Sequence, residues 1–118
     1  MRSFDAQVDV LGRLINAADM RQRVISHNLS NVNTPNYQRL DVDFESQLAA
    51  ELGQSNKVTD ATQPVIYQTP GLVARADGNN VDMDQEIGQM NKNALLQQAY
   101  LQLLGTELNQ MRLAIEGT

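Results

Sequence analysis

Apolar residues recur through the first third of the chain at alternating spacings of four and three, and this pattern limits the possible fold more than any other feature. The stripe consists of Phe4, Val8, Leu11, Ile15, Ala18, Ile25, Leu29 and Val32. Gln22 is its one polar member. A period of about 3.5 residues is typical of helices that wrap around one another. A second stripe lies beside the first and consists of Val10, Leu14, Ala17 and Val24. The segment is therefore predicted to be a long helix whose apolar face is wider than one partner helix covers.

The last third of the chain repeats the pattern. Its stripe consists of Met83, Ile87, Met90, Ala94, Leu101, Leu104, Leu108, Met111 and Ile115. Here too one polar residue, Gln97, occupies the stripe. Between residues 93 and 104 the apolar side chains extend almost around the helix, so we expect this helix to need more than one partner.

The two stripes align as an antiparallel pair when the numbers of facing residues add to 119. Under this rule Ile15 faces Leu104, and Gln22 faces Gln97. A single buried polar layer fixes the register of some coiled coils. The alternative is that each glutamine simply tolerates a partly exposed site.

The middle of the chain is poor in core-forming residues and contains all three prolines. Short β-branched runs at residues 64–67 and 72–75 predict one or two strands, with a possible hairpin about residues 69–71. Residues 49–63 are expected to be the least ordered. The predicted fold is mainly α, with a long antiparallel coiled-coil-like pair of terminal helices. Residues 1–33 and 82–116 would form one coiled-coil domain, joined by a loop-rich segment at 34–81.

Composition excludes several classes of function. The chain of 118 residues has a net charge of -5 and only nine scattered basic residues, so it lacks the basic patch that binds nucleic acid. No run of about 18 apolar residues is present, and the N-terminus lacks the pattern of a secretory signal. The absence of cysteine excludes disulfides, thiol catalysis and cysteine-based metal sites.

The first helix is predicted to end at Thr34-Pro35-Asn36-Tyr37, which has the form of a type II turn. Proline supplies the fixed φ of the second position, and asparagine accepts the positive φ of the third. Asn28, Asn31 and Asn33 precede the turn. Their amides can satisfy the last helix carbonyls or reach a neighbouring chain, although a simple polar helix end would carry the same residues.

Residues 26–37, SHNLSNVNTPNY, resemble the N-terminal signature of the flagellar rod and hook proteins, in which Asn-(aliphatic)-Ala-Asn-x-x-Thr-Pro-Gly-Tyr closes the first helix. Residues 77–84, DGNNVDMD, and 93–101, NALLQQAYL, resemble the C-terminal half of the proximal rod proteins in that family. The chain departs from the signature at Ser30, Asn36 and Gln38, where the family favours alanine, glycine and a basic residue. Asparagine tolerates a positive φ, so the turn is expected to persist.

The resemblance implies a structural subunit of the proximal rod of the bacterial flagellar basal body, in the periplasm and next to the MS ring. The implied partners are copies of the chain itself, other rod proteins, the FliE-type adaptor at the MS ring, and the flagellar type III export apparatus. Export without a cleaved signal peptide is expected. We expect no enzymatic activity, and no cofactor, metal, nucleic acid or small-molecule substrate.

Two groups of site residues follow. The turn motif comprises Asn28, Asn31, Thr34, Pro35, Asn36 and Tyr37. The expected assembly interface comprises Phe4, Val8, Leu11, Ile15, Ile25, Leu29, Met90, Leu95, Leu96, Tyr100, Leu101, Leu104, Leu108 and Met111.

Two alternatives come from other classes of protein. A free-standing helical-hairpin adaptor or export chaperone would share the heptads but would not need the turn motif. A small metal-dependent hydrolase would use Asp41, Asp43 and Glu45, which alternate and would share one side of an extended segment. His27 is the only histidine and is expected to be a surface residue.

Overall fold

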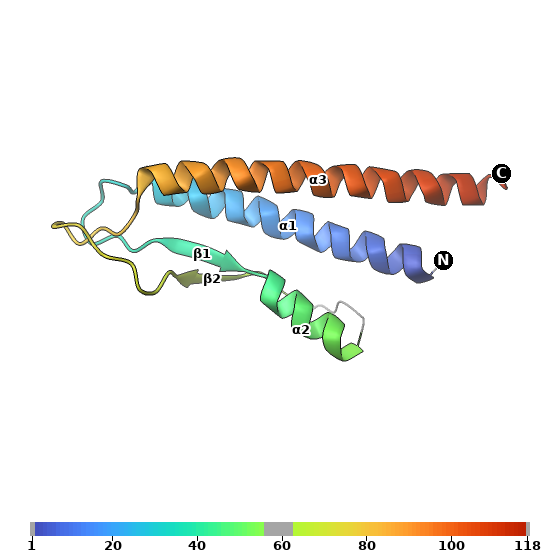
Figure 1. The fold of residues 1–118 in the computed structure, drawn as a ribbon, viewed down its shortest axis with the longest axis horizontal. Helices are drawn as coiled ribbons and strands as arrows, with labels where there is room; N and C mark the ends of the chain where they lie inside the picture. The colour runs from blue at the N-terminus through green and yellow to red at the C-terminus, as the bar shows by residue number, and fades with distance from the viewer. Residues whose placement is uncertain (1, 56–62, 118) are drawn as a thin grey trace.

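The two ends of the chain form long helices that lie side by side and antiparallel (Figure 1). The structure is a computed structural model that describes residues 2–55 and 63–117. Its elements are α1 (Arg2–Ser30), β1 (Leu40–Asp43), α2 (Glu45–Ser55), β2 (Val65–Gln68) and α3 (Met83–Ile115). The molecule measures 65 × 28 × 15 Å. The predicted fold class, a mainly α chain with paired terminal helices and short strands between them, is confirmed.

The register between α1 and α3 differs from the predicted one by about one helical turn. Asn93 on α3 donates from Nδ2 to the carbonyl of Ala18 and to Oε1 of Gln22, both at 2.8 Å. The partner of Gln22 is therefore Asn93 and not Gln97. Because heptad patterns repeat, apolar spacing alone fits several registers, and the amide of Asn93 selects one of them by bonding to two groups of α1.

The side of α3 that faces α1 is more polar than the heptad pattern predicted. Four predicted positions are partly buried, namely Met90, Gln97, Leu104 and Met111. The positions that alternate with them are Glu86, Asn93, Tyr100 and Glu107. The rest of the predicted stripe is exposed, namely Met83, Ile87, Ala94, Leu101, Leu108 and Ile115. The predicted stripe was thus wrong at these six positions, because α3 is rotated to bring its polar groups to partners across the seam.

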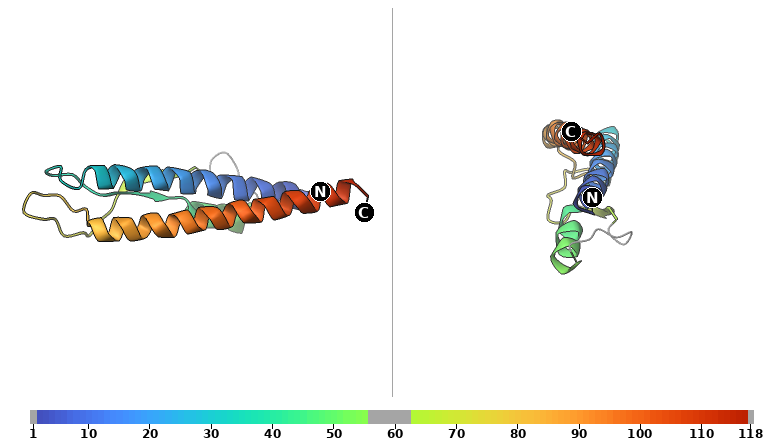
Figure 2. Two further views of the ribbon diagram at one scale, coloured as in Figure 1. Left: turned by 90° about the horizontal axis from the view of Figure 1, so that it is seen from above. Right: turned by 90° about the vertical axis from the view of Figure 1, so that its right-hand side faces the viewer.

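The second apolar stripe of α1 is covered by the middle of the chain. Ala17 packs in a core with Phe44 and Leu48, and Val10, Leu14 and Leu52 surround this core. Figures 1 and 2 show α1 lying between α3 and α2. The expectation of weak order was therefore wrong for residues 49–55, because Leu48 and Leu52 are one turn apart and give α2 an apolar side. Residues 56–62 lie outside the described part of the chain.

The sheet pairs different segments from those expected. β1 and β2 are antiparallel, with Asp41 opposite Tyr67 and Val42 opposite Ile66. The strand predicted at 64–67 is thus confirmed, but residues 72–75 form no strand and the predicted hairpin about residues 69–71 was wrong. Burial explains why residues 40–43, and not residues 72–75, pair with β2: Val42 is only 3 % exposed and packs beneath the helices.

The ends of the helices follow local chemistry. Asp82 caps α3 by accepting a hydrogen bond from the backbone N–H of Gln85 at 3.2 Å, in agreement with the predicted start. α1 ends at Ser30, three residues before the predicted boundary, and turns occupy residues 31–34. In the part of the chain that the structure describes, neither long helix is apolar enough over its length to cross a bilayer.

Candidate assembly interface

The turn after α1 has the predicted geometry. Asn36 is the only non-glycine residue in the described chain with a positive φ, at 63°, and Tyr37 N–H donates to the carbonyl of Thr34 at 3.3 Å. Thr34 also donates from its hydroxyl to Oδ1 of Asn31 at 3.0 Å, and Asn31 Nδ2 donates to the carbonyl of His27 at 2.9 Å. The departure from glycine at position 36 therefore leaves the turn intact.

The loop before α3 closes directly over this turn. Asn36 N–H donates to the carbonyl of Asp77 at 2.9 Å. Gly78 has a φ of +84°, and a Cβ added there would lie 2.3 Å from Oδ1 of Asn36. Only glycine fits this approach. Gln38, the other departure, donates to the carbonyl of Gly78 at 3.0 Å and accepts from Nδ2 of Asn80 at 3.0 Å. An amide in this position both donates and accepts, which a basic side chain does not do.

Asn28 joins α1 to the first strand. Its side chain is 0 % exposed. Nδ2 donates to the carbonyl of Leu40 at 2.8 Å, and Oδ1 accepts from the N–H of Leu40 at 3.0 Å. Nδ2 also lies 3.3 Å from Oε2 of Glu86, and Oδ1 accepts from the hydroxyl of Tyr37 at 2.8 Å. One amide therefore connects α1, the turn, β1 and α3.

These bonds determine which group is the donor in each hydrogen bond of the series Asn28–Tyr37–His27. The backbone of Leu40 fixes which end of the amide is oxygen, and this oxygen can only accept. Tyr37 must therefore donate to it, so the 2.8 Å bond between Tyr37 Oη and His27 Nδ1 has the imidazole as donor. Burial raises the pKa of Tyr37, and the negative charge of Glu86 adds to this effect. The hydroxyl thus stays protonated and keeps its role as donor.

Glu86 is fully buried and pairs with Arg39, whose Nε donates to Oε1. Arg39 also donates from Nη1 to Oδ2 of Asp41 at 3.0 Å and to Oγ1 of Thr69 at 2.9 Å. Burial opposes the charge of Arg39, but its hydrogen bonds with Glu86 and Asp41 raise its pKa. The guanidinium therefore remains charged and links α3 with both strands.

Asn79 completes the contact between the turn after α1 and the segment before α3. It is 0 % exposed and donates from Nδ2 to the carbonyls of Asn31 and Thr34, both at 2.8 Å. Its Oδ1 accepts from the N–H of Val81 at 2.8 Å. Arg75 donates to the carbonyls of Val81 and Val32. The carbonyls of the turn that follows α1 are thus satisfied by the segment that precedes α3.

We call the set Asn28, Tyr37, Arg39, Asn79 and Glu86 the polar junction. Asn28 and Tyr37 belong to the predicted turn motif, whereas Arg39, Asn79 and Glu86 were not predicted as site residues. The only sequence signal for Asn79 was its place in the segment DGNNVDMD. Glu86 carried none, because a glutamate on a helix is ordinarily exposed.

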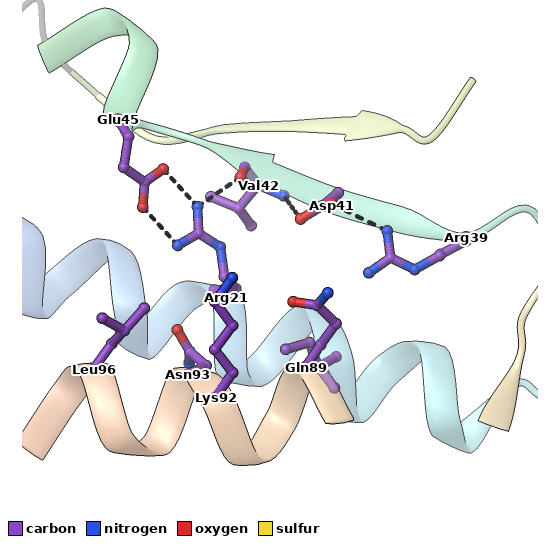
Figure 3. Close-up of a pocket in the computed structure, with 10 residues that line it drawn as sticks. Arg21, Arg39, Asp41, Val42, Glu45, Gln89, Lys92, Asn93 and Leu96 are labelled. Carbon is purple, nitrogen blue, oxygen red and sulfur yellow. Dashed lines mark hydrogen bonds and ion pairs between the residues drawn. The ribbon is translucent and has the colours of Figure 1, made fainter. Parts of the chain in front are cut away.

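The three carboxylates of the hydrolase alternative have separate partners. Asp41 bonds to Arg39, Asp43 accepts from the hydroxyl of Ser46 at 2.6 Å, and Glu45 forms two hydrogen bonds with Arg21 at 2.7 and 2.8 Å. Figure 3 shows the carboxylate of Glu45 facing the guanidinium of Arg21 beside a pocket of about 270 Å³. Within residues 2–55 and 63–117 no three histidine, cysteine or acidic side chains gather as metal ligands do. These residues hold α2 and β1 against α1.

The ion pair of Glu45 and Arg21 predicts that the stability of the protein depends weakly on pH in the acidic range. The hydrogen bonds from Arg21 lower the pKa of Glu45. A lowered pKa in the folded state gives stability that is present above the unfolded pKa and is lost as the pH falls through the folded one. Glu45 is half exposed, so we expect Glu45→Gln to lower the free energy of unfolding at pH 7 by no more than about 1 kcal/mol. Urea titrations of both proteins at pH 7 and pH 3 would measure this difference, which should be smaller at pH 3.

Asp19→Asn is the matched control, because Asp19 pairs with Arg23 on the same helix but both side chains are more than half exposed. Its effect should be smaller than that of Glu45→Gln at pH 7. An unchanged difference between Glu45→Gln and the wild type across this pH range would contradict the assignment.

The residues predicted to form the assembly interface differ in burial. Ile25 is buried inside the chain. Eight are partly buried, namely Val8, Leu11, Ile15, Leu29, Met90, Tyr100, Leu104 and Met111. Four on α3 are exposed, namely Leu95, Leu96, Leu101 and Leu108. The side chain of Phe4 lies outside the described part. A role of these residues in assembly stays a prediction.

One line of apolar residues on α3 is largely exposed in the described chain. It consists of positions seven residues apart, namely Ile87, Ala94, Leu101, Leu108 and Ile115. The exposed fractions are 44 % for Ile87, 51 % for Leu101, 47 % for Leu108 and 70 % for Ile115. We call this set the α3 stripe. A heptad spacing is what a second helix packs against, so the α3 stripe has the form of a helix-binding surface.

Comparison with known proteins gives a consistent result. The family model described as "Flagella basal body rod protein" matches residues 15–38, which cover the second half of α1 and the turn. The chain is 33 % identical over 116 residues to the flagellar basal body rod protein FlgB of Yersinia enterocolitica, covering 82 % of this chain and 84 % of the relative. It is 27 % identical over 127 residues to the protein of the same name from Bacillus subtilis, with 99 % and 98 % covered. The protein of that name from Salmonella typhimurium is 28 % identical over 132 residues, with 97 % and 96 % covered.

Proposed function

The chain belongs to the family of flagellar basal body rod proteins, and from this premise we propose that its terminal helices build the proximal part of the rod by packing against copies of themselves and against other rod proteins. It is a structural component of the flagellar basal body. The relatives carry this role in their names, and no observation favours the adaptor or export chaperone.

The unburied apolar surface is the observation that carries this proposal. In the described residues, fourteen large hydrophobic side chains are exposed, whereas only eight hydrophobic residues form the buried core. The total accessible surface is 7545 Å². A compact monomer of 13.1 kDa exposes roughly 6,400 Å². A surplus of this kind marks a surface that is covered by other chains.

The placement of this surface supports an assembly through the helices. The α3 stripe runs along most of α3, on a helix of 33 residues, and the predicted interface residues Leu101 and Leu108 belong to it. Packing of this stripe against a different surface of the next copy is a heterologous contact, which builds a helical tube when it does not close into a ring. Residues 1–33 and 82–116 would then act together as the coiled-coil domain of the subunit.

The same proposal includes the position of the subunit within the basal body and the proteins that it contacts there. We place the subunit in the periplasmic part of the basal body next to the MS ring, in contact with a FliE-type adaptor. Delivery would use the flagellar type III export apparatus. The support is the family membership together with the turn motif at residues 26–37. A catalytic activity is not part of the proposal, because the acidic residues considered for one have structural partners.

Deletion of the gene in its own bacterium tests the function. We expect the deletion to abolish swimming and to leave basal bodies without a complete rod, since a missing axial subunit stops all later assembly. Restoration of motility by a plasmid copy is the control. The measurements are motility in soft agar and electron microscopy of isolated basal bodies. Normal rods in the deletion strain would overturn the proposal.

A further inference from the structure

The backbone groups of β1 and β2 can be assigned to inner and outer edges. Thr69 N–H donates to the carbonyl of Arg39 at 2.9 Å, so these two residues form a hydrogen-bonded pair. Bonded and non-bonded pairs alternate along an antiparallel ladder. The next pair, Leu40 with Gln68, is therefore non-bonded, and the N–H and C=O groups of both residues point away from the opposite strand. The same holds two residues further along the ladder.

The outer edge of β1 is closed by side chains. Asn28 donates to the carbonyl of Leu40 and accepts from its N–H. Arg21 donates from Nη2 to the carbonyl of Val42 at 2.8 Å, and the N–H of Val42 donates to Oδ1 of Asp41 at 2.7 Å. Every outward backbone group of β1 thus has a partner, and α1 supplies most of them.

Within residues 2–55 and 63–117, the outer edge of β2 has no hydrogen-bonding partner. Its outward groups belong to Ile66 and Gln68, and no hydrogen bond from the described part of the chain reaches them. Val65, Ile66 and Tyr67 are 45 %, 50 % and 40 % exposed. Between Val65 and Gln68 the strand has no charged residue, proline or bulge of the kind that protects a sheet edge, and Pro64 precedes it on the outward side. Figure 1 shows β2 on the side of β1 that faces away from the long helices.

A second open segment follows in the same chain. Residues 72–74, Leu-Val-Ala, are exposed, with Val73 at 92 %. No hydrogen bond from the described residues reaches their backbone groups. Just after them, Arg75 N–H donates to the carbonyl of Asn79 at 2.8 Å, which ties this end of the segment to the loop before α3. Valine suits a strand, yet the segment pairs with no other described residue of its own copy.

We propose that residues 72–74 of one copy add to the outer edge of β2 of the next copy as a third strand. This inference rests on the proposed function, because it needs neighbouring copies in the rod. Free N–H and C=O groups on both segments supply the main-chain bonds of such an addition. Both segments are uncharged, so no ion is buried. The two surfaces differ from each other, so the contact is heterologous and can continue from copy to copy, as a rod requires.

Disulfide cross-linking tests the contact. The chain has no cysteine, so each introduced cysteine reports one position. Gln68→Cys and Val73→Cys would be placed on two differently tagged copies in the deletion strain, and isolated basal bodies would be oxidised. We expect a disulfide between the two tags, and a ladder of oligomers when one copy carries both changes. Homodimers of Gln68→Cys alone would indicate β2 against β2 and would overturn the inference.

The result separates this inference from the proposed function. Complete rods without any cross-link between the two cysteines would refute the added strand and leave the rod function standing. Complete rods in the strain that lacks the chain altogether would refute the rod function.

Proline variants give a second measurement that does not depend on oxidation. Proline removes the backbone N–H, and the N–H groups of neighbouring strand residues point to opposite sides. One of Leu72→Pro and Val73→Pro should therefore abolish motility, while the other should retain it, as should the controls Leu72→Thr and Val73→Thr. The thermal midpoint of the isolated chain should be the same in all four. Full motility of both proline variants would refute the added strand.

Discussion

Asn28→Leu is expected to lower the free energy of unfolding by about 3–5 kcal/mol, at the upper end of what one substitution does. The side chain is fully buried and bonds to Leu40, Tyr37 and Glu86. Leucine has a similar size but no polar atoms, so it leaves the N–H and C=O of Leu40 without partners. A buried polar group without a partner costs about 1–3 kcal/mol. The loss therefore comes from several groups at once and not from lost packing.

Urea unfolding followed by circular dichroism would measure the change. Asn33→Leu is the matched control, because Asn33 lies just beyond the same helix end, is exposed, and makes no hydrogen bond within the described chain. Its effect should stay within about 0.5 kcal/mol. Asn28→Asp should also destabilise, since it removes the donor to Leu40 and sets a carboxylate beside Glu86. If Asn28→Leu lowered the free energy of unfolding by less than about 1 kcal/mol, the polar junction would not be what holds α1 to β1 and α3.

Local chemistry was sufficient to predict the two long helices and the turn that follows the first of them. The type II turn follows from Pro35 and Asn36, whose backbone preferences act within four residues. The cap at Asp82 follows in the same way from one carboxylate and the N–H three residues later. Such features depend on neighbours in the sequence, so they survive whatever the tertiary structure does.

The rotation and register of α3 could not be predicted in this way. Two polar side chains, Glu86 and Asn93, occupy the seam, while Leu101 and Leu108 lie outside it. Hydrophobic pattern ranks leucine first for a buried position. It takes no account of hydrogen-bond partners on the facing elements. Here these partners are the carbonyl of Ala18, which binds Asn93, and the guanidinium of Arg39, which pairs with Glu86. α2 was missed for a similar reason, since its core partner Ala17 lies far away in the sequence.

Burial is distributed unevenly along the pair of helices. Every residue of α3 that is buried lies at or before Asn93, and in the described part of α1 the buried residues begin at Ala17. The end that carries the polar junction is thus the better buried one, while the end with both termini is only partly covered. Local stability follows buried contacts. We infer that the junction acts as a preformed anchor and that the open end gains its packing from neighbouring copies.

The α3 stripe yields the sharpest functional prediction, because there stability and assembly separate. Leu101→Asp and Leu108→Asp should lower the free energy of unfolding of the isolated chain by only about 1 kcal/mol, since both side chains are about half exposed. Both should abolish rod assembly and swimming. Burial of a leucine in a contact contributes about 1.5–3 kcal/mol, and a carboxylate in its place adds a desolvation cost. Each contact between copies would weaken by more than about 100-fold.

Gln102→Asp provides the control, because it places the same charge at an exposed polar position on the opposite side of α3 from the seam. It should allow substantially more rod assembly than Leu101→Asp, measured as basal bodies per cell and as swimming in soft agar. Complementation of the deletion strain by Leu101→Asp at the level of the wild type would contradict the role of the stripe. Equal loss with Leu101→Asp and Gln102→Asp would show that negative charge anywhere on α3 blocks assembly. A specific effect at Leu101 and Leu108 would instead mean that the apolar residues excluded from the intramolecular seam are the ones that join one copy to the next.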